Sequence, residues 1–211
     1  MLAASTLVLF TGAALVLAAM PGPGQSYIAG RTLAAGRRDG LASCAGTALG
    51  GLVHVLAGAV GVSALIMASA TAFGAFKIVG GLYLVYLGIQ TWRTADAPVL
   101  TAGSDTRSDA WRALRQGVVV EAANPKTAAF FLALIPQFVD ASRGSVAVQF
   151  TVLGLISIAL NTGMAVLVVG AASALRERIA SRPNLLRRLR QGSGAVLGSL
   201  GLSLLLTRRP A

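Results

Sequence analysis

The sequence is poor in cysteine, histidine and charge. Its 211 residues include one cysteine, Cys44, and one histidine, His54, and only 12% are Asp, Glu, Lys or Arg. A single cysteine excludes an internal disulfide, and so few thiols and imidazoles give no basis for a metal site. We therefore expect no metal and no cofactor. Soluble domains have about 25% charged residues, so the low charge indicates a chain surrounded mostly by lipid.

What the sequence has instead is long apolar runs. Hydrophobic residues make up 55% of the chain and gather in six segments. They cover 3–20 with a continuation to 35, 41–67, 73–92, 116–139, 145–175 and 191–207. A transmembrane helix needs about 20 apolar residues, so six spans leave only short loops. The pattern predicts an all-α membrane protein of about six transmembrane helices, with one membrane domain over 1–211.

The net charge of +11 comes from arginines that cluster between the apolar runs. Nucleic-acid binding needs a soluble basic face, which the segments leave no room for, so we expect no nucleic-acid partner. Basic loops of membrane proteins lie in the cytoplasm. The loops after the first, third and fifth segments carry three, four and six arginines, against Arg143, Arg208 and Arg209 on the other side. This distribution predicts a multi-pass protein of the bacterial inner membrane with both termini outside.

Two of the apolar segments are interrupted by proline. The first is broken at Pro21, Gly22, Pro23 and Gly24, and the fourth at Asn124, Pro125 and Lys126. Proline removes a backbone donor and clashes with the preceding turn, and each freed backbone group in a membrane needs a partner. Such breaks are therefore tolerated mainly inside protein or beside a water-filled cavity.

The two breaks occupy equivalent positions. Pro23 lies 14 residues before Arg37, and Pro125 lies 15 residues before Asp140. At about 1.5 Å per residue, each break is about 21–22 Å from one surface, near the middle of the bilayer. Three spans per half is an odd number, so the second half must be inverted relative to the first. We expect a first repeat at 1–95, a polar linker at 96–110 and a second repeat at 111–211.

Inverted repeats whose broken helices meet near mid-membrane are typical of secondary transporters. The alternative is that Pro and Gly are simply common in membrane helices, but two equivalent breaks, one with a lysine, favour a transport site. An intramembrane enzyme is not expected, because the chain has no Gly-x-Ser-x-Gly motif. An exporter or channel for cations or other small solutes remains the alternative function.

Several short motifs, in order along the chain, resemble those of the LysE/RhtB family of amino-acid exporters. They are Pro21-Gly22-Pro23, the glycine-rich run 46–61 with His54, the run 77–88, Asn124-Pro125-Lys126, Phe130-Phe131 and Pro136-Gln137-Phe138. The resemblance implies export of amino acids or close derivatives from the bacterial cytoplasm by proton antiport. Family members commonly carry a polar residue, often asparagine, after Pro-Gly-Pro, whereas this chain has Gly24.

Ionisable residues inside the apolar segments are the candidates for binding and coupling, because each such charge costs about 3 kcal/mol. Lys126 begins a half-helix and is predicted to bind the α-carboxylate of the substrate; the alternative is that it pairs with Glu121 or caps a neighbouring half-helix. Glu121 would bind the substrate ammonium or carry the coupling proton, unless it forms a static ion pair. His54 suits a proton relay, with hydrogen-bonded packing as its alternative. Lys77, near the outer start of the third segment, is expected to reach the membrane surface.

The remaining predicted contacts come from backbone and small residues. Asn124 offers a donor and an acceptor, and Pro21, Gly22, Pro23 and Gly24 would supply exposed carbonyls and close approach. The glycines of the second segment predict close helix packing of the small-xxx-small type, and through it a homodimer. The expected partners are therefore an amino acid, protons, the lipid bilayer and a second copy of the chain.

Overall fold

The computed structural model describes residues 2–68 and 109–174, together with single positions between 78 and 93 and at 202. Every regular element in these residues is helical. The elements are α1 (Ala4–Ala19), α2 (Pro23–Ala35), α3 (Arg37–Ala68), α5 (Ala110–Ala122), α6 (Pro125–Ala129), the π-helical turn η1 (Phe130–Leu134), the 3-10 turns η2 (Ile135–Phe138) and η3 (Ala141–Arg143), and α7 (Val146–Ala174). Apart from those single positions, the predicted third and sixth segments lie outside the described residues.

The described helices have the lengths and compositions of four membrane spans. Two are continuous, Arg37–Gly61 within α3 and Val146–Ala174, and two are bent pairs. The first pair joins Ala4–Ala19 to Pro23–Ala35 at 47°, and the second joins Ala110–Ala122 to Pro125–Phe138 at 43°. The bends fall where proline interrupts the sequence, so the prediction that the first and fourth spans are broken is confirmed.

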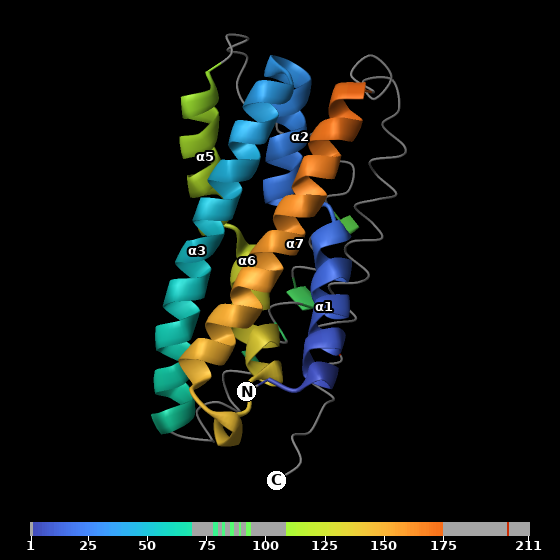
Figure 1. Ribbon diagram of the computed structural model, residues 1–211. Coiled ribbons are helices and arrows are strands. Elements are labelled where there is room, and N and C mark those ends of the chain that lie inside the picture. Colours follow the sequence, from blue (N-terminus) through green and yellow to red (C-terminus); the bar gives the residue numbers. More distant parts are fainter. Residues whose placement is uncertain are drawn as a thin grey trace.

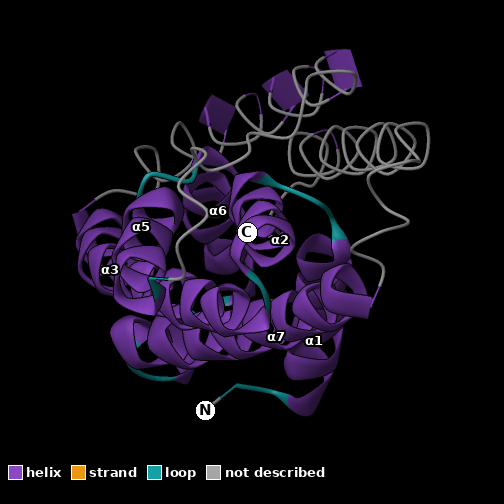
Figure 2. Ribbon diagram, turned by 90° about the horizontal axis from the view of Figure 1, so that it is seen from above, coloured by secondary structure: helices purple, strands orange, loops and turns teal. Residues whose placement is uncertain are grey.

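The two halves run in opposite directions. In Figure 1, α1 and α2 ascend and α3 descends, whereas α5 and α6 descend and α7 ascends, and both breaks lie at about the same height. Seen from above, α2 and α6 lie in the middle (Figure 2). The pair α3 and α5 lies to one side of them, and the pair α1 and α7 to the other. This is the antiparallel arrangement that an inverted repeat requires.

Two helix starts lie earlier than the apolar pattern placed them. Gly36 has φ of 92°, a left-handed conformation that ends α2 and lets α3 begin at once, four residues before the predicted start at 41. Asp109 accepts a hydrogen bond from the Arg112 N–H at 3.0 Å, which caps α5 at Ala110 rather than at 116. An apolar pattern marks only the part of a helix that lies in lipid. Both helices begin before that part.

The turn between α6 and α7 is held by one buried amide. Gln149 donates to the Asp140 carbonyl at 2.8 Å and accepts from the Asp140 N–H at 3.1 Å. Hydrogen bonds from Ser142 hold the pKa of the exposed Asp140 carboxyl below its usual range. Hydrogen bonds thus help to fix the turn that links the second broken span to α7.

Glycines bring α3 into close contact with α5 and α7. A Cβ atom added to Gly46 would overlap the Leu114 carbonyl, and one added to Gly50 would lie 2.5 Å from the Val118 carbonyl oxygen. A Cβ atom on Gly58 would overlap the Phe150 ring. The predicted small-residue packing is therefore confirmed, and its partners are helices of the same chain.

Gly46→Ala should lower the free energy of unfolding by about 1–3 kcal/mol, the usual cost of overpacking. The obstructing atom belongs to the backbone of α5, so the two helices would have to separate. Gly61→Ala is the matched control, because nothing lies within 4 Å of its Cβ position. Thermal unfolding of both variants in detergent measures the difference, and equal melting temperatures would show that α3 and α5 are less tightly packed than described.

Candidate functional site

The two helix breaks meet. The Lys126 ammonium donates to the carbonyls of Met20 at 2.8 Å and Leu17 at 3.1 Å, which belong to the C-terminal end of α1. A Cβ atom on Gly22 would lie 3.0 Å from Cδ of Lys126. The prediction that the two interrupted spans come together is thus confirmed, and the contact of Lys126 is the helix-capping one considered above.

Glu121 lies on the other side of the same junction. Its carboxylate accepts hydrogen bonds from the Asn124 side-chain amide at 3.0 Å and from the Thr127 hydroxyl at 2.6 Å. Asn124 also accepts from the Lys126 N–H at 3.0 Å, which caps the start of α6. A Cβ atom on Gly24 would overlap Oε2 of Glu121, so the glycine lets the carboxylate approach the first turn of α2.

The site therefore holds one ammonium and one carboxylate, each at the end of a half-helix. The exposed fractions of Lys126 and Glu121 are 7% and 3%. Lys126 lies at the C-terminal end of α1, which carries partial negative charge, and Glu121 lies at the N-terminal end of α2, which no side chain caps. Helix ends stabilise charges of the opposite sign, which is why the bundle tolerates both ions.

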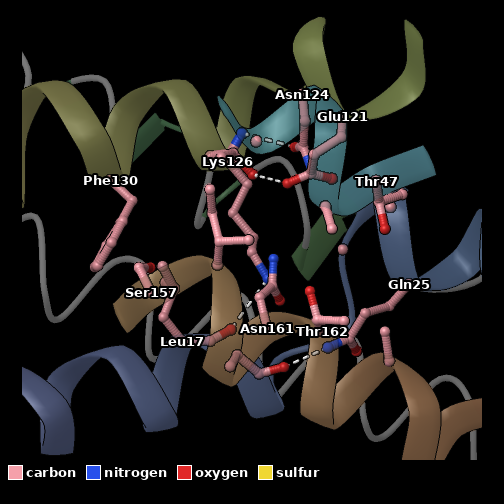
Figure 3. Close-up of a pocket in the computed structure, with 18 of the residues that line it drawn as sticks. Leu17, Gln25, Thr47, Glu121, Asn124, Lys126, Phe130, Ser157, Asn161 and Thr162 are labelled. Atoms are coloured by element: carbon pink, nitrogen blue, oxygen red, sulfur yellow. Dashed lines mark hydrogen bonds between the residues drawn. The ribbon is translucent and has the colours of Figure 1, made fainter. Parts of the chain in front are cut away.

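A small polar cavity separates these groups from α7. About 40 Å³ of it is open to the centre of a water molecule, room for about three waters. Its polar lining consists of Gln25, Thr47, Glu121, Asn124, Lys126, Thr127, Ser157, Asn161 and Thr162. Figure 3 shows the α7 residues across the cavity from Glu121 and Asn124.

Apolar side chains cover the cavity on both sides. Toward the lower end in Figure 1 lies a cluster from α1, α3, α6 and α7 that includes Phe10, Phe131 and Phe150. Toward the upper end lies a smaller cluster, Tyr27, Ile28, Cys44, Ala165 and Val169. The cavity thus lies near the middle of the bundle, between the two apolar clusters.

Comparison with known proteins shows the family. The sequence pattern of the LysE type translocators matches residues 15–208. The chain belongs to this family. It is therefore a membrane transporter and not an enzyme.

Relatives of this LysE type translocator cover most of its length. A homoserine/homoserine lactone efflux protein of Salmonella typhimurium is 32% identical over 88% of the chain and 89% of its own length. An uncharacterized membrane protein of Vibrio cholerae is 33% identical over 90% of the chain and 92% of its own. A leucine efflux protein of Salmonella choleraesuis is 22% identical over 66% of each. No solved structure matches.

The predicted site residues of the translocator separate into two groups. Gly22, Gly24, Glu121, Asn124 and Lys126 line the cavity. Pro21, Pro23 and Pro125 do not, and Pro23 is exposed. The prolines therefore shape the breaks, while their neighbours face the cavity. Whether these residues bind substrate stays a prediction.

His54 lies behind the site rather than in it. Its Nε2 is 2.9 Å from the Glu121 carbonyl oxygen, and its ring centre is 5.7 Å from that of Phe131. A carbonyl only accepts hydrogen bonds, so Nε2 carries the proton. This is the packing role considered above, and its part in proton coupling stays a prediction. Lys77 lies outside the described residues.

Sequence reasoning missed the polar wall on α7. Ser157, Asn161 and Thr162 lie near the midpoint of a span that is otherwise almost wholly apolar. Their position near the middle of the membrane was the available signal, because polar groups there need a partner. The residues predicted for the site did not include them, nor did they include Gln25 and Thr127.

A buried ion pair joins the helices at the upper end. Arg31 donates to the Asp39 carboxylate at 2.6 Å, and their exposed fractions are 3% and 0%. The same carboxylate accepts from the Asp109 N–H at 3.2 Å. The Tyr27 hydroxyl donates to the Ala113 carbonyl at 2.8 Å. These bonds connect α2, α3 and α5, and thus the two halves of the translocator.

Proposed function

We propose that this translocator exports an amino acid or a close derivative across the bacterial inner membrane in exchange for protons. Two of its relatives are named for the efflux of homoserine or its lactone and of leucine. The observation that carries the proposal is the buried ammonium of Lys126 and carboxylate of Glu121 beside the polar cavity near the middle of the bundle. Those two charges are the complement of a zwitterion.

On binding, the substrate would replace the present hydrogen-bond partners of Lys126 and Glu121. Its α-carboxylate would pair with Lys126, which at present donates to carbonyls of α1. Its ammonium would pair with Glu121, which at present accepts from Asn124 and Thr127. The bonds that are given up are already charge-assisted, because one partner in each is ionised. In exchange each charge gains a partner of opposite sign, and the Coulomb attraction between the two compensates for those bonds.

Proton coupling follows from the same carboxylate. Glu121 can hold a proton or the substrate ammonium, but binding both would leave the ammonium without a counter-ion. Protonation from outside would release the substrate, and loss of the proton to the cytoplasm would prepare the site for the next molecule. This alternation is the requirement for antiport.

The charges at the helix ends support cytoplasmic entry from the upper side of Figure 1. The C-terminal end of α2 and the N-terminal ends of α3 and α5 lie there, and they carry Arg31, Arg37, Arg38, Arg112 and Arg115. Arg143 lies at the opposite end. With basic loops in the cytoplasm, both termini would lie outside. A homodimer would need surfaces other than Gly46, Gly50 and Gly58, which already pack inside the chain.

The test is counterflow and gradient-driven uptake of a panel of labelled amino acids in proteoliposomes. Wild-type protein should exchange at least one amino acid without a gradient and accumulate it when a proton gradient is imposed. Glu121→Gln should slow exchange, because the amide is an uncharged partner for the substrate ammonium. The exchange that remains should lose gradient-driven accumulation at least about tenfold, because the amide holds no exchangeable proton. The Thr127 hydroxyl can donate or accept, so the amide can be accommodated in place of the carboxylate.

Three results would contradict parts of the proposal. Ion current without exchange of any amino acid would indicate a channel or a cation exporter instead. Exchange that ignores the proton gradient in wild type would remove antiport but leave amino-acid export. Full gradient-driven uptake by Glu121→Gln would assign the coupling proton to another group.

A further inference from the structure

The polar wall on α7 is the part of the cavity that the ionic contacts do not use. Ser157, Asn161 and Thr162 come from the middle of a 29-residue helix and all line the cavity. Asn161 lies 15 residues after Val146, the first residue of the helix, which places it about 22 Å along the span. That is the depth of the two breaks.

The side chains of this wall have no partners among the described residues. Each of the other polar side chains that line the cavity makes a hydrogen bond, to backbone or to another side chain. No hydrogen bond is made by the side chains of Ser157, Asn161 or Thr162 in the described part of the chain. An amide has two donor hydrogens and an acceptor oxygen, and leaving them unpaired in a membrane is costly. A ligand or a water in the cavity would satisfy Asn161.

The geometry also says which part of a substrate would reach this wall. Glu121, Asn124 and Lys126 come from the α5–α6 side, and Figure 3 shows Asn161 and Thr162 on α7, across the cavity from Glu121 and Asn124. An amino acid whose ammonium and carboxylate occupy the first wall would point its side chain at the second. This step rests on the proposed function, because the ionic contacts fix the orientation.

We infer that Asn161, assisted by Thr162, determines specificity by selecting amino acids whose short, uncharged side chain ends in a hydroxyl or an amide. Such a group would donate to and accept from the Asn161 amide, replacing the water that otherwise fills the cavity. An apolar side chain of the same size would displace that water and leave the amide unpaired. Sites built to hydrogen-bond a substrate group discriminate strongly against analogues that lack it.

The experiment is competition counterflow in proteoliposomes with two near-isosteric pairs, threonine against valine and asparagine against leucine. Wild type should favour the polar member of each pair about tenfold or more, the factor expected for the loss of one hydrogen bond at a buried polar group. Asn161→Leu, of similar volume, should bring the ratio to about one or reverse it while valine or leucine still exchanges. Leu167→Ala, a change to a 65% exposed residue of the same helix, should leave the ratio unchanged.

Thr162→Val provides a second test that is nearly isosteric, so it reports on the wall even if Asn161→Leu does not assemble. It should lower the preference for the polar member by a smaller factor. A wild type that exchanges amino acids without preference, or variants that keep the wild-type ratio, would overturn the inference and leave amino-acid export standing. A wild type that exchanges no amino acid at all would overturn the proposed function, and this assignment with it.

Discussion

Lys126→Met should slow amino-acid exchange about 10- to 100-fold. A hydrogen bond to a charged group contributes about 1.5–3 kcal/mol, and 1.4 kcal/mol is a factor of ten. The variant has neither the proposed partner of the substrate carboxylate nor the two bonds to the C-terminal carbonyls of α1. Initial rates of counterflow in proteoliposomes, at equal amounts of inserted protein, measure the effect.

Two further variants separate binding from folding. Arg143→Met removes an equal charge from an exposed pair with Asp140 and should exchange like wild type. Lys126→Met combined with Glu121→Gln removes both buried charges, so its melting temperature should recover relative to Lys126→Met while exchange stays low. If the double variant exchanges normally, Lys126 has only a structural role. If Lys126→Met itself exchanges like wild type, the residue does not belong to the site.

The broken spans could be predicted because proline acts locally. Pro23 and Pro125 each begin a half-helix, as their missing N–H and fixed φ require. The meeting of the breaks followed from equal depth and inverted direction, which are properties of the whole pattern. Thus the meeting of the two breaks was readable from spacing alone. Of the contacts across it, the sequence suggested only that Lys126 could cap a neighbouring half-helix.

The partners of each charged residue could not be predicted, because they come from distant parts of the chain. Lys126 bonds to carbonyls more than 100 positions earlier. Asp39 falls between the predicted first and second segments, yet Gly36 lets α3 begin at Arg37, and Asp39 is buried in its first turn. His54 gave no sign in the sequence that its partner is the carbonyl of Glu121. Backbone partners are especially hard to foresee, since every residue has a carbonyl.

The breaking of the Arg31–Asp39 pair should have the largest effect on stability. Arg31→Met would take from the Asp39 carboxylate, 0% exposed, the guanidinium that donates to it at 2.6 Å. Removing one partner of a buried ion pair costs about 3–5 kcal/mol, even though the Asp109 N–H remains as a donor. Cys44 is the only cysteine of the chain and is buried, so its alkylation by a fluorogenic maleimide during heating reports unfolding.

Comparison with an exposed ion pair tests whether burial causes the loss of stability. Arg143→Met breaks a pair whose side chains are 56% and 46% exposed, and exposed pairs contribute at most about 1 kcal/mol. Arg31→Met combined with Asp39→Asn should recover most of the loss, because an amide needs no cation and still accepts from Asp109. If the double variant melts as low as Arg31→Met, the loss comes from the missing guanidinium and its packing between α2 and α5. Recovery would show instead that charge balance, rather than the ion pair itself, is what this junction between the two halves requires.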